Sequence, residues 1–230
     1  MKLAALTHVS TRTDSTGASL LSFRPRRPFP YRAGQFGLWI VGASARPFTI
    51  ASAPTDEFIQ LGTRLHTESR IKRGLSSLRP GDTIRLLGPF GRIAPADDGG
   101  PVVYVAQGIG ITPARALIRA RSRRNQTLIH VGAPYFRDEL EPLVDTAFYP
   151  AGRDDLAAAL TTVVPAAGEA HYVVAGNTTF VTETSQALRE LGAAPDRIHA
   201  DGFIGLTDHA SNSAAAPRNG ELRRISEALE

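Results

Sequence analysis

The sequence predicts two domains: an antiparallel β-domain, either a barrel or a sandwich, followed by an α/β domain on a parallel sheet. The hydrophobic pattern alternates in the first half, whereas the second half has continuous apolar runs followed by helical spacing. A polar stretch without periodicity, APADDGG, separates the halves at 94–100. We expect domains at 1–95 and 96–207, and a tail at 208–230 whose ELRRISEALE end can form a helix.

Short strands account for the first half. Apolar residues alternate in QFGLWIV at Phe36, Leu38 and Ile40, and the same period recurs in FIQLGTRL and DTIRLLG. Glycine and proline lie in the gaps between these segments, where turns need them. Several short strands with turn signals between them are typical of a barrel or a sandwich.

Strands and helices alternate in the second half. PVVYVAQ, TLIHVGA, AHYVVAGN and RIHADGF are apolar runs typical of parallel strands that are buried on both faces. PARALIRARSRR and FVTETSQALRELG have helical spacing, and Phe180, Thr184 and Leu188 share one face of the second helix. This alternation predicts βαβ units around a parallel sheet.

Composition excludes several kinds of protein. The chain has no cysteine, which excludes disulfides, thiolate-held iron–sulfur clusters and a catalytic thiol. Its six histidines lack metal-ligand spacing, so no metal site is expected. No apolar run is long enough for a membrane span or a secretory signal, and we expect a cytoplasmic protein.

Charge is divided unevenly between the halves. Residues 1–95 hold 14 Lys and Arg against 5 Asp and Glu, whereas residues 96–207 hold 9 against 13. Part of the excess is a cluster of arginines in one short stretch, Arg24, Arg26, Arg27 and Arg32. The asymmetry indicates either an acidic partner for the first half or an ordinary drift of surface charge.

A glycine-rich turn, QGIGITP, follows the first apolar strand of the second half. Gly108 and Gly110 would form the turn, Thr112 would be the N-cap of the next helix and Pro113 its first residue. Amides at a helix start favour a phosphate, and glycine lets the backbone approach it. The turn is therefore either a phosphate site or a structural strand–helix connection.

The segment SARPFTIASAP sets an arginine, an aromatic ring and a hydroxyl on one strand, as Arg46, Phe48 and Thr49. A strand that only packs a core needs no such set. With the other motifs it gives a recognisable order: AGQF, RPFTIAS, GLSSL with GD, GPFG, QGIGITP, VVAGN and DGF. In this order the chain resembles the ferredoxin–NADP reductase superfamily, in which an antiparallel flavin-binding barrel precedes a nicotinamide-nucleotide domain.

The resemblance assigns roles on the barrel strand. Arg46 would pair with the pyrophosphate of FAD, which suits a guanidinium group. Phe48 would stack on or flank the isoalloxazine, and Thr49 would hydrogen-bond near flavin N5, the atom that accepts hydride. Phe48 and Thr49 are therefore the candidate catalytic residues.

The remaining implied cofactor contacts come from both domains. Residues of GLSSL would start a helix whose amides bind the same phosphates. The full set of further candidates is Gly74, Ser76, Ser77, Gly108, Gly110, Thr112, Ala175, Gly176 and Phe203.

The sequence departs from the family pattern in both domains. Phe48 stands in place of the usual tyrosine, and Ala175 in place of a cysteine that many members set beside the nicotinamide. Asn177 replaces a proline of the same motif.

A further departure concerns the choice of nucleotide. Ala133 and Pro134 stand where many members have Ser-Arg for the 2′-phosphate, with Arg137 and Asp138 nearby. NADH and NADPH therefore both stay open as NAD(P)H.

The expected function is that of an FAD-dependent NAD(P)H oxidoreductase. Hydride would pass from nicotinamide to flavin N5, and electrons would then reach a separate acceptor. This acceptor could be an acidic carrier such as a ferredoxin or flavodoxin, a partner oxygenase, a ferric complex or a free flavin; no nucleic acid is expected. Ala175 and Asn177 motivate an alternative, a flavoprotein subunit or sensor of the same fold without turnover. A flavin-free binding module conflicts with the intact RPFT strand.

Overall fold

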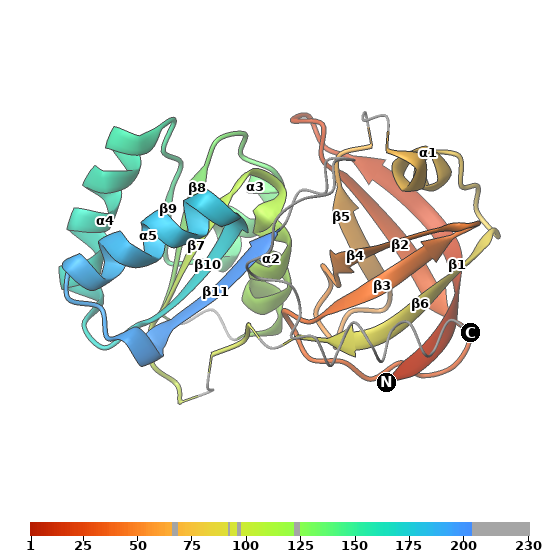
Figure 1. Ribbon diagram of the computed structural model, residues 1–230, viewed down its shortest axis with the longest axis horizontal. Coiled ribbons are helices and arrows are strands. Elements are labelled where there is room, and N and C mark those ends of the chain that lie inside the picture. Colours follow the sequence, from red (N-terminus) through yellow and green to blue (C-terminus); the bar gives the residue numbers. More distant parts are fainter. Residues whose placement is uncertain (66–68, 92, 96–97, 122–124, 204–230) are drawn as a thin grey trace.

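Two β-sheets lie side by side, with helix α2 (Ile111–Ala120) between them (Figure 1). The computed structural model describes residues 1–65, 69–91, 93–95, 98–121 and 125–203, and of 201–203 only the backbone.

The first sheet is antiparallel and curls into a half-barrel, with the order β4-β3-β6-β1-β2-β5. Its strands are β1 (Lys2–Thr13), β2 (Ser19–Pro25), β3 (Phe36–Val41), β4 (Ser44–Thr49), β5 (Ile59–Thr63) and β6 (Thr83–Phe90). A short helix, α1 (Arg70–Ser76), precedes β6. The predicted antiparallel barrel class is thus confirmed in its six-stranded, open form.

Strand β3 buries a different face from the one that its apolar alternation suggests. Phe36, Leu38 and Ile40 are only half-buried, whereas Trp39 is fully buried in the half-barrel core. The indole Nε1–H of Trp39 donates to the carbonyl of Phe48 at 3.0 Å. The largest side chain therefore determines which face packs inward, and its hydrogen bond fixes β4 against β3.

The second sheet is parallel, with the order β11-β10-β7-β8-β9, and confirms the α/β prediction. Its strands are β7 (Val102–Gln107), β8 (Gln126–Val131), β9 (Thr146–Phe148), β10 (His171–Asn177) and β11 (Ile198–Phe203). The other helical segments are η1 (Gly108–Gly110), α3 (Arg137–Leu140), η2 (Glu141–Leu143), α4 (Arg153–Ala167), α5 (Thr178–Glu190) and η3 (Pro195–Arg197). The chain leaves β7 toward β8 and returns beside it as β10, so the strand order reverses between β7 and β10.

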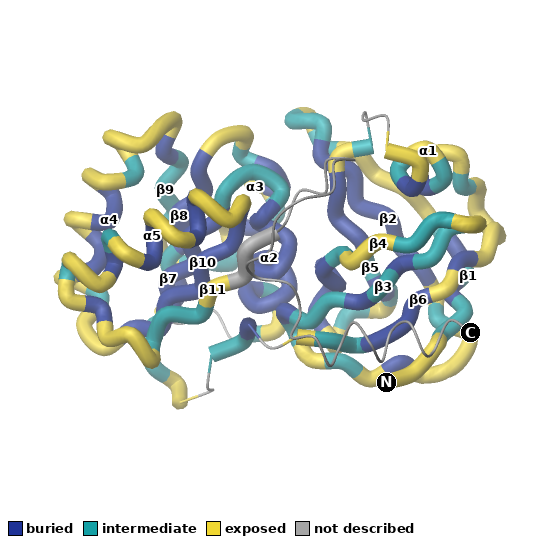
Figure 2. The backbone as a smooth tube through the Cα atoms, in the orientation of Figure 1, coloured by how far each residue is buried: buried dark blue, intermediate teal, exposed yellow. Residues whose placement is uncertain are grey.

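The two faces of the parallel sheet pack against different partners. Val103, Val105 and Val174 face α4 and α5. Tyr104 and Ala106 face α2, within a core cluster that also takes in side chains of the half-barrel. Figure 2 shows α2 as buried along most of its length, whereas α4 and α5 expose their outer sides. The contact between the two sheets is therefore itself part of the hydrophobic core.

The division of the chain into domains at residue 95 stays a prediction, as does the tail at 208–230, which lies outside the described residues. Among those residues, no helix is long and apolar enough to cross a membrane.

Candidate functional site

Arg46 and Phe48 lie two residues apart on β4 and so point to the same side of the sheet. Arg46 is exposed, and the only hydrogen bond of its side chain to described residues goes to the neighbouring carbonyl of Ala45, at 3.1 Å. Phe48 is half-buried. This face of β4 thus presents a guanidinium group without an acidic partner next to an accessible aromatic ring, which fits a planar, anionic cofactor.

Thr49 ends β4 and is only 3% exposed. Its hydroxyl is buried and has no hydrogen-bond partner among the described residues. A buried hydroxyl without a partner costs about 1–3 kcal/mol, so such groups are usually satisfied by an ordered water or by a ligand. This atom fits the predicted flavin contact.

The prediction that Gly74, Ser76 and Ser77 start a helix is wrong. Helix α1 ends at Ser76, and Ser77 is its C-cap. The hydroxyls of Ser76 and Ser77 donate to carbonyls one turn back, at 2.9 Å each. A helix C-terminus carries free carbonyls and partial negative charge, so it has no amides for a phosphate. Gly74 has a packing reason instead, since a Cβ there would lie 2.9 Å from Val41 Cγ1.

The glycine turn is a single 3₁₀ turn that runs directly into α2. Gly108 has φ +51°, and the turn closes at Gly110, which is the N-cap of α2. The helix begins at Ile111, so the prediction of Thr112 as N-cap and Pro113 as first residue is wrong by two positions. Because the 3₁₀ turn already supplies helical backbone, Thr112 lies in the first turn, and its hydroxyl donates to the Ile109 carbonyl at 3.2 Å.

Gly110 is required by the protein itself. A Cβ at this position would lie 2.6 Å from the carbonyl oxygen of Ala175 and 3.0 Å from Gly176 Cα. The close approach of the β10 backbone therefore explains glycine at this position. Substitution of Gly110 should disturb the packing of α2 on β10 before it disturbs any ligand.

The VVAGN segment ends β10 at the carboxyl edge of the sheet. Ala175 and Gly176 are buried, whereas Asn177 is exposed. Asn177 is the N-cap of α5, because its side-chain oxygen accepts a hydrogen bond from the Phe180 amide at 2.9 Å. Capping gives a physical reason for this departure from the family motif. Phe203 pairs with Asn177 through the backbone of β11.

His130 contacts the glycine turn through a hydrogen bond to Gly108. It is not among the candidate site residues that the sequence predicts. It is fully buried on β8, and its Nε2 lies 2.9 Å from the carbonyl oxygen of Gly108. Since a carbonyl only accepts, Nε2 carries the proton, and the buried Nδ1 has no partner among the described residues. Burial lowers the pKa of His130 to about 4, although the bond to Gly108 opposes the shift. A histidine inside the apolar run TLIHVGA was the available signal.

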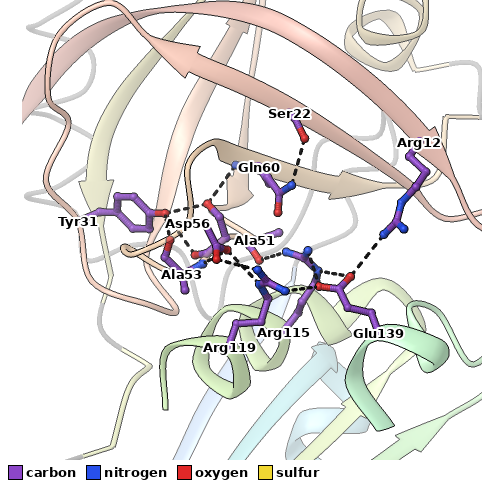
Figure 3. Close-up of polar contacts among 11 residues, drawn as sticks. Arg12, Ser22, Tyr31, Ala51, Ala53, Asp56, Gln60, Arg115, Arg119 and Glu139 are labelled. Carbon is purple, nitrogen blue, oxygen red and sulfur yellow. Dashed lines mark hydrogen bonds and ion pairs between the residues drawn. The ribbon is translucent and has the colours of Figure 1, made fainter. Parts of the chain in front are cut away.

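A network of ion pairs joins the two sheets (Figure 3). Arg115 of α2 is 2% exposed, and its guanidinium donates to the Ala51 carbonyl and to both carboxylate oxygens of Glu139. Arg119, one turn further on, forms two hydrogen bonds with Asp56 at 2.7 and 3.0 Å and one with Glu139 at 2.9 Å. The segment after β4 is therefore fastened to the helix after the glycine turn.

The network also keeps the carboxylate of Asp56 ionised. Burial acts to raise the pKa of Asp56, but hydrogen bonds from Arg119 and the Ala53 amide hold it below its ordinary value. A second junction lies at Asp14, whose carboxylate accepts from the Phe136 amide at 2.9 Å. Arginine inside the apolar stripe of PARALIRA was the sequence signal for this interface.

The loop after β8 has its basic residue engaged. Arg137 forms an ion pair with Glu141 at 2.8 Å, and its guanidinium carbon lies 4.3 Å from the centroid of the Tyr149 ring. The guanidinium of Arg137 is therefore held in place by two neighbouring side chains.

Two hollows lie outside these contacts. A groove of about 650 Å³ between α4 and α5 is lined at the carboxyl edge of the sheet by Gln107, Gly132 and Asn177. Arg153 and Glu183 also line it and form an ion pair at 3.0 Å.

The second hollow, of about 560 Å³, is on the half-barrel and is lined by Lys2, Arg26 and Arg27 without an acidic residue. These three cations have no ion pair within the described residues, whereas Arg24 pairs with Glu57 at 3.1 Å.

Comparison with known proteins gives distant relatives. No family model matches the chain. It is 34% identical over 133 residues to ferredoxin–NADP reductase B of Sorangium cellulosum, covering 51% of this chain and 54% of that protein. It is 33% identical over 131 residues to sulfhydrogenase 1 subunit gamma of Pyrococcus furiosus, covering 51% and 44%. The chain thus spans about half the length of these curated relatives.

Solved structures share the fold at low sequence identity. A ferredoxin NADP⁺ reductase from Neisseria gonorrhoeae with bound FAD and NADP has a TM-score of 0.73 at 20% identity, covering 88% of this chain and 99% of that one. The ferredoxin reductase in carbazole 1,9a-dioxygenase has a TM-score of 0.75 at 20% identity, covering 88% and 68%.

Proposed function

We propose that the chain is an FAD-dependent NAD(P)H reductase of the ferredoxin–NADP reductase-like family, whose curated relatives are 33–34% identical to about half of it and whose solved structures share its fold. When bound, the flavin would accept a hydride at N5 from the nicotinamide and release electrons to a separate acceptor. The observation that carries the proposal is the buried Thr49 hydroxyl, which lacks a partner among the described residues.

Three features of the chain support the roles of its residues. Arg46 offers to the pyrophosphate a guanidinium that forms no ion pair with the residues the structure describes, and Phe48 offers a ring to the isoalloxazine on the same side of β4. The Arg115 contact with Ala51 holds the end of this strand against α2. The protein would thus supply alignment and exclusion of water, because no acid–base group is needed for hydride transfer.

The test is a visible spectrum of the purified protein followed by anaerobic titration with NADH and with NADPH. We expect a yellow protein with FAD that one of the two nucleotides bleaches. A colourless protein that takes up no added FAD would contradict the proposal. Bound FAD that neither nucleotide reduces would favour the alternative, a flavoprotein without turnover, which Ala175 motivates.

Thr49→Val sharpens the test, because the two side chains have nearly the same shape. If the hydroxyl serves the flavin, the variant should keep FAD, be reduced more slowly, and unfold in its flavin-free form at a higher urea concentration than the wild type. The last effect follows because valine removes a buried polar atom without a partner. An unchanged reduction rate would contradict the role of Thr49.

For the acceptor we propose a protein with an acidic surface. Support comes from the hollow lined by Lys2, Arg26 and Arg27. These three side chains form no ion pair with the described residues, so their charges are available to an acidic partner protein. A ferredoxin, a flavodoxin or a partner oxygenase would fit this charge.

A further inference from the structure

Gln107 and Asn177 lie on either side of the point where the strand order reverses. Gln107 ends β7, Asn177 ends β10, and these two strands are neighbours with Ala106 opposite Ala175. In open α/β sheets, ligands bind outside the carboxyl ends of strands at such a point. Both residues also line the groove between α4 and α5.

A chain of hydrogen bonds fixes the direction of both side-chain amides. The Phe180 backbone N–H can only donate, so the atom of Asn177 that receives it must be the oxygen Oδ1. The nitrogen Nδ2 of Asn177 then points to Gln107 and donates to its Oε1 at 2.7 Å. The amide nitrogen Nε2 of Gln107 is left as the outer end, and no described residue accepts from it.

The backbone beneath the pair keeps it in place. A Cβ at Gly176 would lie 2.6 Å from the Phe180 ring and 3.0 Å from Gln107 Cβ. Glycine therefore allows the Gln107 side chain and α5 to approach each other, which brings the two amides within hydrogen-bond distance.

We propose that Gln107 donates a hydrogen bond to an oxygen of the pyridine nucleotide and that Asn177 is the positioning residue that turns its amide nitrogen outward. This inference rests on the proposed function and adds a residue pair to its nucleotide site. The acceptor is an oxygen of the pyrophosphate or of the nicotinamide carboxamide, both of which accept from an amide N–H.

The test measures binding of NAD⁺ and NADP⁺ by calorimetry, which needs no turnover. Gln107→Leu should weaken binding of the preferred nucleotide roughly tenfold, the effect of one hydrogen bond to an acceptor oxygen. Thr182→Leu is the control, since Thr182 is an exposed polar residue of α5 outside the groove lining, and this variant should bind as the wild type does.

Asn177→Asp separates orientation from capping. Aspartate caps helices as well as asparagine does, so the fold should be kept. Its second oxygen can only accept, so Gln107 would turn its Nε2 inward and present Oε1 to the nucleotide. We expect a loss at least as large as that of Gln107→Leu.

Asn177→Ser controls for the added charge of aspartate, because serine also caps but does not reach Gln107. It should weaken binding in the wild type and change nothing in the Gln107→Leu background. Equal effects of Asn177→Ser in both backgrounds would overturn the positioning role, and wild-type binding in Gln107→Leu would overturn the whole inference.

ADP-ribose identifies the acceptor, because it has the pyrophosphate but no nicotinamide. A loss that also appears with ADP-ribose supports the pyrophosphate, and a loss confined to the dinucleotide supports the carboxamide. A wild-type protein that binds neither dinucleotide would overturn the inference together with the proposed function, whereas normal wild-type binding with unaffected variants would overturn the inference alone.

Discussion

Arg46 is the cation on β4, and no acidic residue in the described part of the half-barrel pairs with it. If it pairs with the FAD pyrophosphate, Arg46→Ala should weaken FAD binding roughly 10- to 100-fold, as expected for a lost charge-assisted hydrogen bond. Equilibrium dialysis with FAD measures this change. Arg12→Ala, on an exposed arginine of β1, serves as a control and should bind FAD normally; equal FAD affinity in the two variants would contradict the role of Arg46.

His130 makes the stability of the protein depend on pH. Its folded pKa of about 4 lies below the ordinary 6.5, so between these values the unfolded state binds a proton that the folded state does not. Stability is therefore full above pH 6.5 and is lost as the pH falls toward 4, by roughly 2 kcal/mol between pH 7 and pH 5.

Urea unfolding at the two pH values measures this loss. His130→Gln keeps a donor for the Gly108 carbonyl and removes the titrating ring, so its stability should fall less between pH 7 and pH 5. The same decrease in both proteins would assign the pH dependence to other groups.

At the scale of elements, α2 and α3 meet through the carboxylate of Glu139. Glu139→Gln would leave the buried Arg115 without its negative partner, which should lower the free energy of unfolding by about 3 kcal/mol. Glu141→Gln is the control two residues away: its pair with Arg137 is exposed, and we expect no measurable change in urea unfolding. Similar losses in the two variants would mean that burial of Arg115 does not matter.

Element types could be predicted from the sequence, but element boundaries could not. Alternation and continuous apolar runs predict the antiparallel and the parallel sheet, because the spacing of apolar residues reflects whether one or both faces of a strand are buried. The motif GLSSL was placed at the wrong end of α1, since glycine and serine occur at both ends of helices and α1 is only 7 residues long. For α2, the preceding 3₁₀ turn shifted the start by two residues, a tertiary effect with no local signal.

The sequence also does not predict the contacts that distant elements make around the candidate site. The strand residues Arg46, Phe48 and Thr49 were visible as an unusual set, and their roles stay predictions. The link from Arg115 to Ala51 spans 64 residues of sequence, and the partner of a buried arginine cannot be read from its own helix.

At the scale of the whole molecule, charge should direct the choice of acceptor. If the acceptor is an acidic protein, its reduction should slow steeply with salt, because the Debye length falls from about 10 Å at 0.1 M to about 3 Å at 1 M. Stopped-flow reduction of a ferredoxin or flavodoxin at increasing salt measures this.

Single charge reversals locate the docking surface. Arg26→Glu should lower the association rate and leave reduction of the flavin by NAD(P)H unchanged. Arg189→Glu, on the opposite lobe in the last turn of α5, is the matched reversal and should change the association rate little. A rate insensitive to salt and to both reversals would indicate a small acceptor such as a ferric chelate.

The core cluster that unites Ala18, Leu20 and Ala51 of the half-barrel with Tyr104 and Ile118 of the other lobe has a consequence for how the chain can be divided. Either half produced alone would expose this apolar face to water. It would also leave charged groups such as Arg119 and Asp56 without their partners in the other half. The two halves should therefore melt together, and calorimetry of the intact chain should give one heat-absorption peak. We therefore expect the two sheets to unfold as one cooperative unit, and two separate heat-absorption peaks would contradict this.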